Sequence, residues 1–273
     1  MRLYPVRIRD LVAAAILLLG FSSCGRDEPD RAPDGAELFD VAIYQDVGCW
    51  STSVTALERM FEWMGYRVTR VDADRVNRAG LQGCALFCVP GGDMYQYSHS
   101  LSSEGKDKIR EFIRAGGGYI GICGGAYFAA DRVFWQGRRL DMDPLGLYQG
   151  SSVGPVDEIV PYPDSGMCRI QMVDRTHPIT AALPDSAWVL YYWGPELLPD
   201  SLSSVTVLGK YSAVDEPAIL AFGYGLGRVF LIGVHPEIEE DDDRDGVDCA
   251  EGFDDWGSDW DLMKQATLWC LNR

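Results

Sequence analysis

Hydrophobic residues along the chain fall into two kinds of pattern, short continuous runs and longer segments with a helical period. Residues 39–44 form the first run, and residues 53–65 follow it with apolar side chains three and four positions apart. Buried strands and amphipathic helices produce these two patterns, and Ser53 and Gly65 are suited to cap and to end the helix. The sequence therefore predicts a strand, a loop and a helix as the first unit of an α/β fold.

The same alternation continues through the first half of the chain. Further strands are predicted at residues 66–71, 85–89 and 119–122, with a helix at residues 105–115. Strands that alternate with helices pair in parallel and are covered by helices on both faces. We therefore expect a mostly parallel, doubly wound sheet of the flavodoxin-like type.

From residue 153 onward the pattern changes to short strands separated by turns. Strands are predicted at residues 158–160, 169–173 and 205–209, followed by a hairpin of residues 218–222 and 228–234. The second strand of that hairpin is apolar throughout, as in a strand buried on both faces. This half predicts an antiparallel extension packed on the parallel sheet, and a helix at residues 260–271 ends the chain.

The first 24 residues have the pattern of an export signal. Arginines at positions 2, 7 and 9 precede an apolar run of 11 residues, which is shorter than the roughly 20 that a membrane-spanning helix needs. Two small residues then precede Cys24, and this ending resembles the lipobox of bacterial lipoproteins. The resemblance implies a lipid on Cys24. An ordinary signal peptide followed by a free cysteine is the alternative.

Residues 25–37 contain proline, glycine and charged residues without an apolar period. This composition is typical of a flexible tether. The folded domain is then expected over residues 38–273. We accordingly expect an exported protein of the bacterial cell envelope, anchored to a membrane through its lipid.

The composition excludes other classes of protein. Forty-seven per cent of the 273 residues are hydrophobic, enough for a large core, so a disordered chain is excluded. Asp and Glu number 41 against 24 Lys and Arg, which gives a net charge of −17. Such a chain repels phosphate backbones, and nucleic acid is not an expected partner.

Much of the negative charge lies between residues 237 and 261. Within this segment, Asp241, Asp243 and Asp245 precede Gly246 as in the opening of a calcium-binding loop. The match is incomplete, because glycine occupies the position at which the loop needs a bidentate acid. We favour a solvated acidic loop that disfavours anionic substrates, with calcium as the alternative and no cofactor required.

The segment Gly-Ile-Cys-Gly-Gly at residues 121–125 directly follows a predicted strand. Small neighbours on both sides of Cys123 suit a nucleophile elbow, and the following helix N-terminus favours its thiolate. Backbone N–H groups of Gly124 and of Gly92, in the glycine-rich turn after the third strand, could stabilise an oxyanion. The alternative is that the glycines allow close packing around an inert cysteine.

His235 is the best placed of the three histidines to act as a base. It follows a buried strand, at the edge where α/β sheets bind ligands, and Glu237 can orient its imidazole. The alternative is a surface histidine in a turn. His99 and His177 lie in segments that look like loops, and we interpret both as ordinary polar residues.

These motifs resemble the class I glutamine amidotransferase fold. Within it, residues 90–93, 121–128 and 191–195 are similar to the biotin-protein ligase N-terminal domain family, with a likeness that extends over residues 38–273. The resemblance implies Cys123 as nucleophile, with His235 as base and then acid. It also implies Glu237 as the orienting group and Gly92 and Gly124 as oxyanion donors.

The resemblance also limits the expected reaction. Biotinylation is not implied, because no segment resembling the ligase catalytic domain follows, and no segment suits the charged groups of glutamine. An exported protein has no obvious synthase to receive ammonia. We therefore expect hydrolysis of an amide or related acyl bond in a small molecule or peptide. A non-catalytic binding or envelope-scaffold lipoprotein with this fold is the alternative.

Two further groups of residues leave alternatives open. Outside the cytoplasm, six cysteines could form disulfides whose pairing the sequence does not choose, although two of them could be buried apolar side chains instead. The six are Cys49, Cys84, Cys88, Cys168, Cys249 and Cys270. Seven aromatic residues could line a pocket or belong to the core, and we assign Phe128 and Tyr191 to the core. The seven are Tyr95, Tyr97, Tyr127, Phe128, Tyr191, Tyr192 and Trp193.

Overall fold

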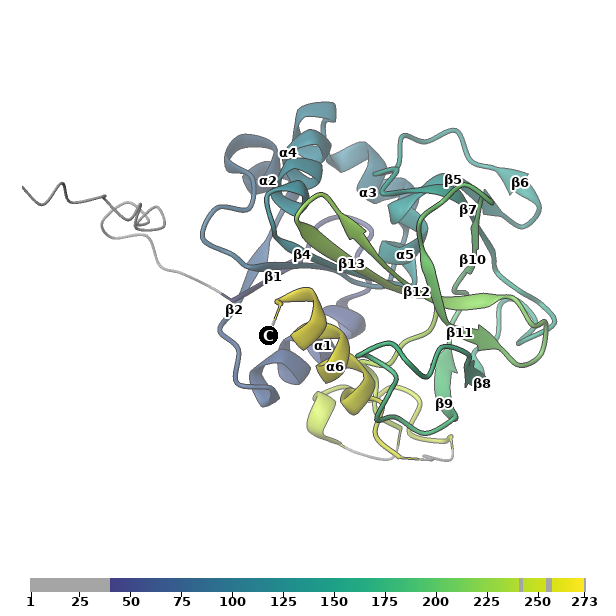
Figure 1. Cartoon of the computed structure of the whole chain (residues 1–273). Helices are drawn as coiled ribbons and strands as arrows, with labels where there is room; N and C mark the ends of the chain where they lie inside the picture. Colours follow the sequence, from purple (N-terminus) through teal and green to yellow (C-terminus); the bar gives the residue numbers. More distant parts are fainter. Residues whose placement is uncertain (1–39, 241–242, 254–256, 273) are drawn as a thin grey trace, which may run out of the picture. The chain divides into compact units, whose positions relative to one another are not determined.

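The computed structural model describes residues 40–240, 243–253 and 257–272, which belong to one compact unit, Glu37–Arg273 (Figure 1). The predicted export signal, Cys24 and the tether lie outside the described residues. The elements in chain order are β1 (Val41–Tyr44), α1 (Ser51–Trp63), β2 (Val68–Val71), α2 (Ala73–Ala79), β3 (Leu86–Val89), α3 (Met94–Ser100), α4 (Ser103–Arg114), β4 (Gly118–Ile122), α5 (Gly124–Ala129), β5 (Ala130–Trp135), β6 (Arg138–Arg139), β7 (Tyr148–Gly154), β8 (Gly166–Met172), β9 (Ser186–Tyr191), β10 (Glu196–Pro199), β11 (Thr206–Tyr211), β12 (Pro217–Tyr224), β13 (Gly227–Ile232), the 3-10 turn η1 (Asp243–Asp245) and α6 (Trp260–Cys270).

The main sheet has nine strands in the order β2-β1-β3-β4-β13-β12-β11-β8-β9. Pairing is parallel from β2 to β13 and antiparallel from β13 to β9. The predicted α/β class, with a mostly parallel sheet and an antiparallel extension, is confirmed. The extension continues the same sheet at one edge, because β13 pairs with β4 on one side and with β12 on the other.

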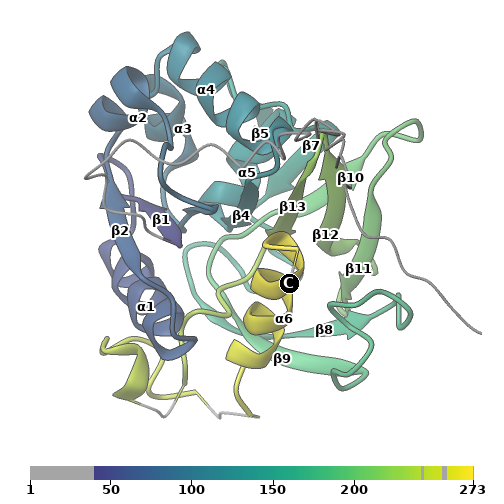
Figure 2. The same cartoon turned by 60° about the vertical axis from the view of Figure 1, so that its left-hand side comes forward.

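Helices cover both faces of this sheet, as the alternation of buried side chains requires. Val41 and Ile43 pack in the cluster that includes α1 and α6, whereas Ala42 and Tyr44 pack in the cluster that includes α2 to α5. Figure 2 shows α1 and α6 on one side of the strands and α2, α3 and α4 on the other. Among the helices that the structure describes, none is long and apolar enough to span a bilayer.

A second, four-stranded sheet was not predicted from the sequence. Its order is β10-β7-β5-β6, and it packs in the same buried cluster as α5. Glycine, serine and glutamine weaken the apolar alternation of β7, and β6 consists of two arginines. Its strands therefore lack the hydrophobic pattern that reveals the main sheet.

The predicted strand at residues 158–160 is wrong, because a turn occupies these positions. Three prolines surround the segment, Pro155, Pro161 and Pro163. Proline has no backbone N–H, so a ladder of hydrogen bonds cannot form on both sides of so short a segment.

All seven described cysteines are free thiols, namely Cys49, Cys84, Cys88, Cys123, Cys168, Cys249 and Cys270. Cys88 and Cys270 lie fully buried in the apolar clusters, and Cys84 is half-buried. Within the described residues the cysteines form no cross-link, and Cys88 and Cys270 fill space in the core.

The strand register brings three turns to one edge of the main sheet. Val89 of β3 pairs with Gly121 of β4, and Ile122 of β4 pairs with Ile232 of β13. Since these neighbouring strands are parallel, the residues that follow them emerge side by side. The turns that contain Gly92, Cys123 and His235 therefore meet at this edge.

Candidate active site

Cys123 occupies a strained turn between β4 and α5. Its φ of 46° and ψ of −102° lie outside the regions that side-chain-bearing residues ordinarily adopt. The flanking glycines are required: a Cβ on Gly121 would lie 2.7 Å from the carbonyl oxygen of Gly125, and a Cβ on Gly125 would overlap Val89. The sequence thus folds here as the predicted elbow, with the thiol at the end of a buried strand.

Gly92 and Gly124 bring two backbone amides together beside Cys123. Gly92 has a φ of +142°, and a Cβ on Gly124 would lie 2.8 Å from the Gly92 nitrogen. Among the described residues, neither amide N–H donates a hydrogen bond. Two unpaired N–H groups next to a nucleophile are the arrangement that an oxyanion requires.

His235 and Glu237 lie together in the interior behind this turn. The Nδ1–H of His235 donates to Oε1 of Glu237 over 2.9 Å, and both side chains are at most 1% exposed. The backbone N–H of His235 donates to the Leu190 carbonyl over 2.9 Å, which fixes the residue to β9. Glu237 therefore holds the imidazole by Nδ1 and leaves Nε2 for another partner.

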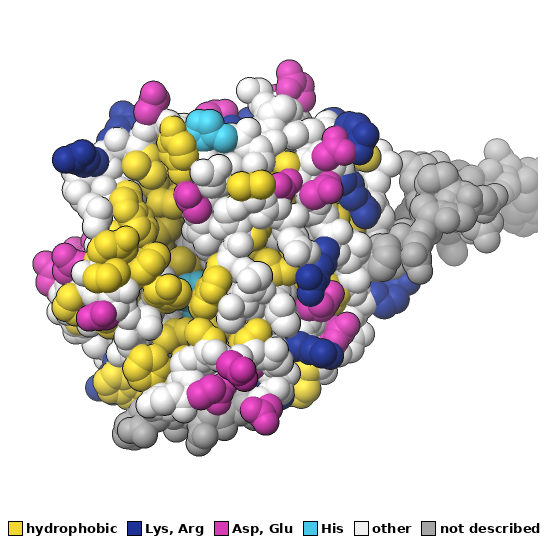
Figure 3. Space-filling model, turned by 180° about the vertical axis from the view of Figure 1, so that it is seen from behind, with side chains coloured by type: hydrophobic (Ala, Val, Ile, Leu, Met, Phe, Trp, Pro, Cys, Tyr) yellow, Lys and Arg dark blue, Asp and Glu magenta, His cyan; other side chains and the backbone are white. Residues whose placement is uncertain are grey.

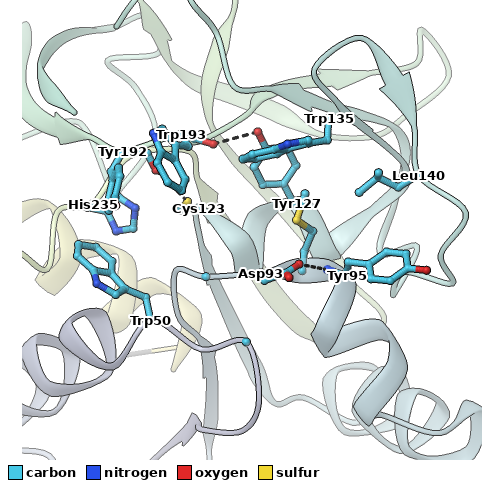
Figure 4. Close-up of a pocket in the computed structure, with 13 residues that line it drawn as sticks. Trp50, Asp93, Tyr95, Cys123, Tyr127, Trp135, Leu140, Tyr192, Trp193 and His235 are labelled. Atoms are coloured by element: carbon cyan, nitrogen blue, oxygen red, sulfur yellow. Dashed lines mark hydrogen bonds between the residues drawn. The ribbon is translucent and has the colours of Figure 1, made fainter. Parts of the chain in front are cut away.

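Cys123 and His235 lie at the same end of the pocket (Figure 4). The thiol of Cys123 donates to the Tyr192 carbonyl over 3.5 Å, and Nε2 of His235 has no hydrogen-bond partner among the described residues. A hydrogen bond between a nucleophile and its base is often long or poorly aligned before a substrate is present. The structure thus places the predicted nucleophile and base together, with Nε2 unpaired.

The charge state of His235 depends on these neighbours. Burial disfavours the charged imidazolium, but the negative charges of Glu237 and Cys123 outweigh it and raise the pKa of His235 from 6.5 to about 10. The imidazolium is therefore the favoured form of His235 at neutral pH.

Ser53 completes this cluster and was not identified as a site residue from the sequence. We predicted it as the cap of the first helix, but α1 begins at Ser51 with Trp50 as its N-cap. The Ser53 hydroxyl instead donates to Oε1 of Glu237 over 2.5 Å and accepts from the Gly91 N–H over 3.1 Å. The sequence signal that could have identified it is a serine in the first turn of the helix after β1, at the sheet edge where the glycine-rich turns lie.

Gly91, whose N–H donates to Ser53, also packs against the imidazole of His235. A Cβ on Gly91 would overlap Cε1 of His235 and lie 3.2 Å from its Nδ1. The ring therefore packs directly on the glycine backbone. The loop after β3 consequently fixes the position of His235 as well as offering the Gly92 amide.

A cavity of about 580 Å³ opens above Cys123 and His235. Six of the thirteen lining residues are Trp or Tyr. On the surface, hydrophobic side chains gather in a band on one face of the unit (Figure 3). The lining residues are Gly48, Trp50, Gly92, Asp93, Met94, Tyr95, Cys123, Tyr127, Trp135, Leu140, Tyr192, Trp193 and His235.

The candidate aromatic residues divide between this pocket and the core. Four of the seven line the pocket, namely Tyr95, Tyr127, Tyr192 and Trp193. Phe128 and Tyr191 are fully buried, as assigned, and Tyr97 is buried with its hydroxyl 2.9 Å from the Gly91 carbonyl. Trp50, the N-cap of α1, and Trp135, at the end of β5, also line the pocket and were not identified from the sequence.

The other two histidines do not line the pocket, although His99 packs on the lining residue Tyr95 with ring centroids 4.2 Å apart. His99 is on α3, not in a loop, and it is exposed with Nδ1 2.7 Å from the Tyr95 carbonyl. His177 accepts from the Ile179 N–H over 3.2 Å and packs on Trp269. Neither side chain lines the cavity.

The acidic segment that begins after His235 is described only in part. Asp241 lies outside the described residues, and Asp243 belongs to η1. Asp245 is buried, and its carboxylate accepts from the N–H groups of Glu239 and Val247 over 3.0 and 3.1 Å. In the described ranges, no three acidic, histidine or cysteine side chains come together as a metal site would require.

The chain is similar to known proteins in sequence. A model of the family described as biotin-protein ligase, N terminal, matches residues 39–252. The biotin–protein ligase of Schizosaccharomyces pombe is 28% identical over 165 residues, which cover 56% of this chain and 25% of that protein. An uncharacterized protein of Chlamydia muridarum is 46% identical over 160 residues, which cover 56% of this chain and 60% of that protein. The matches thus span less than two thirds of either relative.

The fold is similar to that of solved structures. A glutamine amidotransferase from Thermotoga maritima matches with a TM-score of 0.55 and 13% identity, over 87% of this chain and 100% of that chain. A ThuA-like protein from Bacteroides uniformis matches with a TM-score of 0.52 and 14% identity, over 89% and 95% of the two chains. At these identities the likeness is one of fold.

Proposed function

This chain belongs to the biotin-protein ligase N-terminal family, and we propose that it is a cysteine-dependent hydrolase of amide or related acyl bonds. The observation that carries the proposal is the convergence of Cys123, His235 and the two unpaired amides of Gly92 and Gly124 at one end of a pocket. A nucleophile, a proton carrier and oxyanion donors are the groups that acyl transfer requires.

The first half of the reaction forms an acyl-enzyme. The thiolate of Cys123 attacks the carbonyl carbon, and the N–H groups of Gly92 and Gly124 stabilise the negative charge on oxygen. The imidazolium of His235 donates its Nε2 proton to the leaving amine as the carbon–nitrogen bond breaks. A thioester on Cys123 and a neutral imidazole remain.

The second half releases the acyl group. Nε2 of His235, now neutral, accepts a proton from water as the water oxygen attacks the thioester carbon. The carbon–sulfur bond breaks, which yields a carboxylic acid and returns the thiolate and imidazolium. Glu237 holds Nδ1 throughout and stabilises the positive charge of the ring.

The test is acyl transfer from p-nitrophenyl acetate, because this ester is a generic acyl donor. We expect a burst of p-nitrophenol and an acetyl group on Cys123, located by peptide mass spectrometry, and loss of both in Cys123→Ala. Cys84→Ala is the control, because Cys84 is a half-buried free thiol that does not line the pocket. Acetylation equal at several cysteines, with no burst, would support the non-catalytic binding or scaffold protein instead.

We also propose that the protein is exported to the cell envelope and carries a lipid on Cys24. The basic residues, the short apolar run and the small residues before Cys24 support this proposal. Metabolic labelling of the full chain in bacteria with an alkynyl fatty acid tests it. We expect labelling that Cys24→Ala abolishes and Cys49→Ala does not; unlabelled protein in the soluble fraction would refute the anchor.

A further inference from the structure

The walls of the active-site pocket carry an unusual balance of charge and aromatic surface. Six of the lining side chains are aromatic, one is the carboxylate of Asp93, and none of the described lining residues is lysine or arginine. The Lys and Arg side chains visible on the face in Figure 3 lie outside the hydrophobic band. A ligand in this pocket meets ring surfaces and negative charge.

This balance opposes a substrate with a carboxylate group in the pocket. An α-carboxylate, such as that of a free amino acid, finds no cation to pair with there apart from His235, which the reaction itself uses. Asp93 adds negative potential, and the low-dielectric wall of a pocket strengthens such a field. The net charge of −17 acts in the same direction.

The aromatic wall is held with ring carbon surface available to a ligand. The Tyr127 hydroxyl donates to the Trp193 carbonyl over 3.0 Å, and Nε1 of Trp193 donates to the Asp164 carbonyl over 3.2 Å. These polar atoms are therefore already occupied. Trp135 packs against Trp193 with centroids 6.4 Å apart and planes at 75°, so the two rings brace each other.

Asp93 lies across the pocket from Trp135 (Figure 4). Its Oδ1 accepts from the Tyr95 N–H over 2.9 Å, which fixes the carboxylate, and Oδ2 has no hydrogen-bond partner in the described part of the chain. A carboxylate on one side and indole rings on the other are a favourable surrounding for an organic cation, which ring faces and negative charge both attract.

We propose that the pocket selects a cationic substrate, an amide whose recognised group is an ammonium or amidinium held between Asp93 and the aromatic wall. The assignment of an amide rests on the proposed function; the selection for a cation rests on the pocket wall alone. The cation would lie in the aromatic part of the cavity, while the carbonyl to be attacked lies at Cys123.

Binding to Cys123→Ala separates the two proposals, because no reaction is needed. Benzamidine, benzamide and benzoate have nearly the same shape and carry charges of +1, 0 and −1. We expect calorimetric titration at pH 7 and low salt to give the tightest binding for benzamidine, at least fivefold tighter than benzamide, and the weakest for benzoate. Equal binding of benzamidine and benzamide, or tighter binding of benzoate, would overturn the selection for a cation.

Two variants of the pocket wall, with one control, test whether Asp93 and Trp135 cause the preference for a cation. In the Cys123→Ala background, Asp93→Asn should weaken the binding of benzamidine at least threefold and leave the binding of benzamide unchanged. Glu216→Gln removes the same charge from an exposed turn away from the pocket and should change neither. Trp135→Leu should weaken benzamidine in a protein whose thermal transition is retained, and unaltered affinity in both pocket variants would overturn the proposal. Cation selection without acyl transfer in the wild type would refute the hydrolase alone.

Discussion

The hydroxyl of Ser53 donates a 2.5 Å hydrogen bond to Glu237, although 184 positions separate the two residues in the chain. The same hydroxyl accepts from Gly91, so the first turn of α1 joins the loop after β3 to the carboxylate after β13. The orientation of His235 consequently depends on three elements that are distant in sequence. The first prediction concerns this link.

Ser53→Ala should destabilise the protein and weaken the activation of Cys123. It leaves the buried Gly91 N–H without an acceptor, which costs about 1 to 3 kcal/mol, and it frees Glu237 to move away from His235. We expect slower alkylation of Cys123 below pH 7, measured by peptide mass spectrometry, and restoration in Ser53→Thr. Ser51→Ala, on the exposed start of the same helix, should have neither effect. A loss of stability alone would make Ser53 merely structural.

His235→Gln should slow iodoacetamide alkylation of Cys123 at pH 6 by at least tenfold. An ordinary thiol with a pKa of about 8.5 is mostly protonated at that pH, whereas an adjacent imidazolium keeps the thiolate populated. The rate is measured between pH 5 and 9 for the wild type and the variant. His177→Gln, outside the pocket, serves as the control. Labelling that is slow in the wild type and indifferent to His235 would contradict an activated thiolate.

Gly91→Ala should lower the rate of acyl transfer from p-nitrophenyl acetate at least a hundredfold. The new methyl group overlaps Cε1 of His235, and the ring must move away from Cys123 and Glu237. A matched control is Gly252→Ala, since a Cβ there meets nothing within 4 Å. If Gly91→Ala folded and retained its burst, the packing of His235 on this loop would have no functional role.

The stability of the protein should depend on pH through His235. The pKa of this residue is raised from 6.5 to about 10 in the folded state, despite burial, by Glu237 and Cys123. Its contribution to the free energy of unfolding is therefore complete below pH 6.5 and is lost as the pH rises through about 10. In urea denaturation, the difference in free energy of unfolding between the wild type and His235→Gln should become smaller as the pH rises over this range. A difference in unfolding free energy that widens as the pH rises would refute the ion pair.

Much of the candidate site could be predicted because its residues directly follow predicted strands. Cys123 follows β4 and His235 follows β13, and the parallel pairing of these strands places both at one edge. Local patterns of hydrophobic residues and glycines therefore fixed where the two side chains would meet. The same reasoning placed Gly92 beside Gly124, because β3 and β4 are neighbours in the sheet.

The rest of the site depends on contacts that local patterns do not contain. Ser53 reaches Glu237 because the first turn of α1 lies beside the segment that follows β13, and no pattern near either residue indicates this contact. Trp135 lines the pocket because the second sheet folds over it, and the strands of that sheet have weak apolar alternation. Sequence patterns predict elements well, but the packing of one element on another is decided by the whole chain.

The second sheet contributes a part of the pocket wall that lies apart from Cys123 and His235 in the fold. Trp135 ends β5 and Leu140 follows β6, so one short hairpin supplies both side chains to the outer wall of the pocket. Cys123 and His235 instead follow β4 and β13 of the main sheet. Grafting a different β5–β6 hairpin onto this scaffold should therefore change which ligands the pocket accepts while Cys123 stays in place, which makes the hairpin the natural unit for redesigning the pocket.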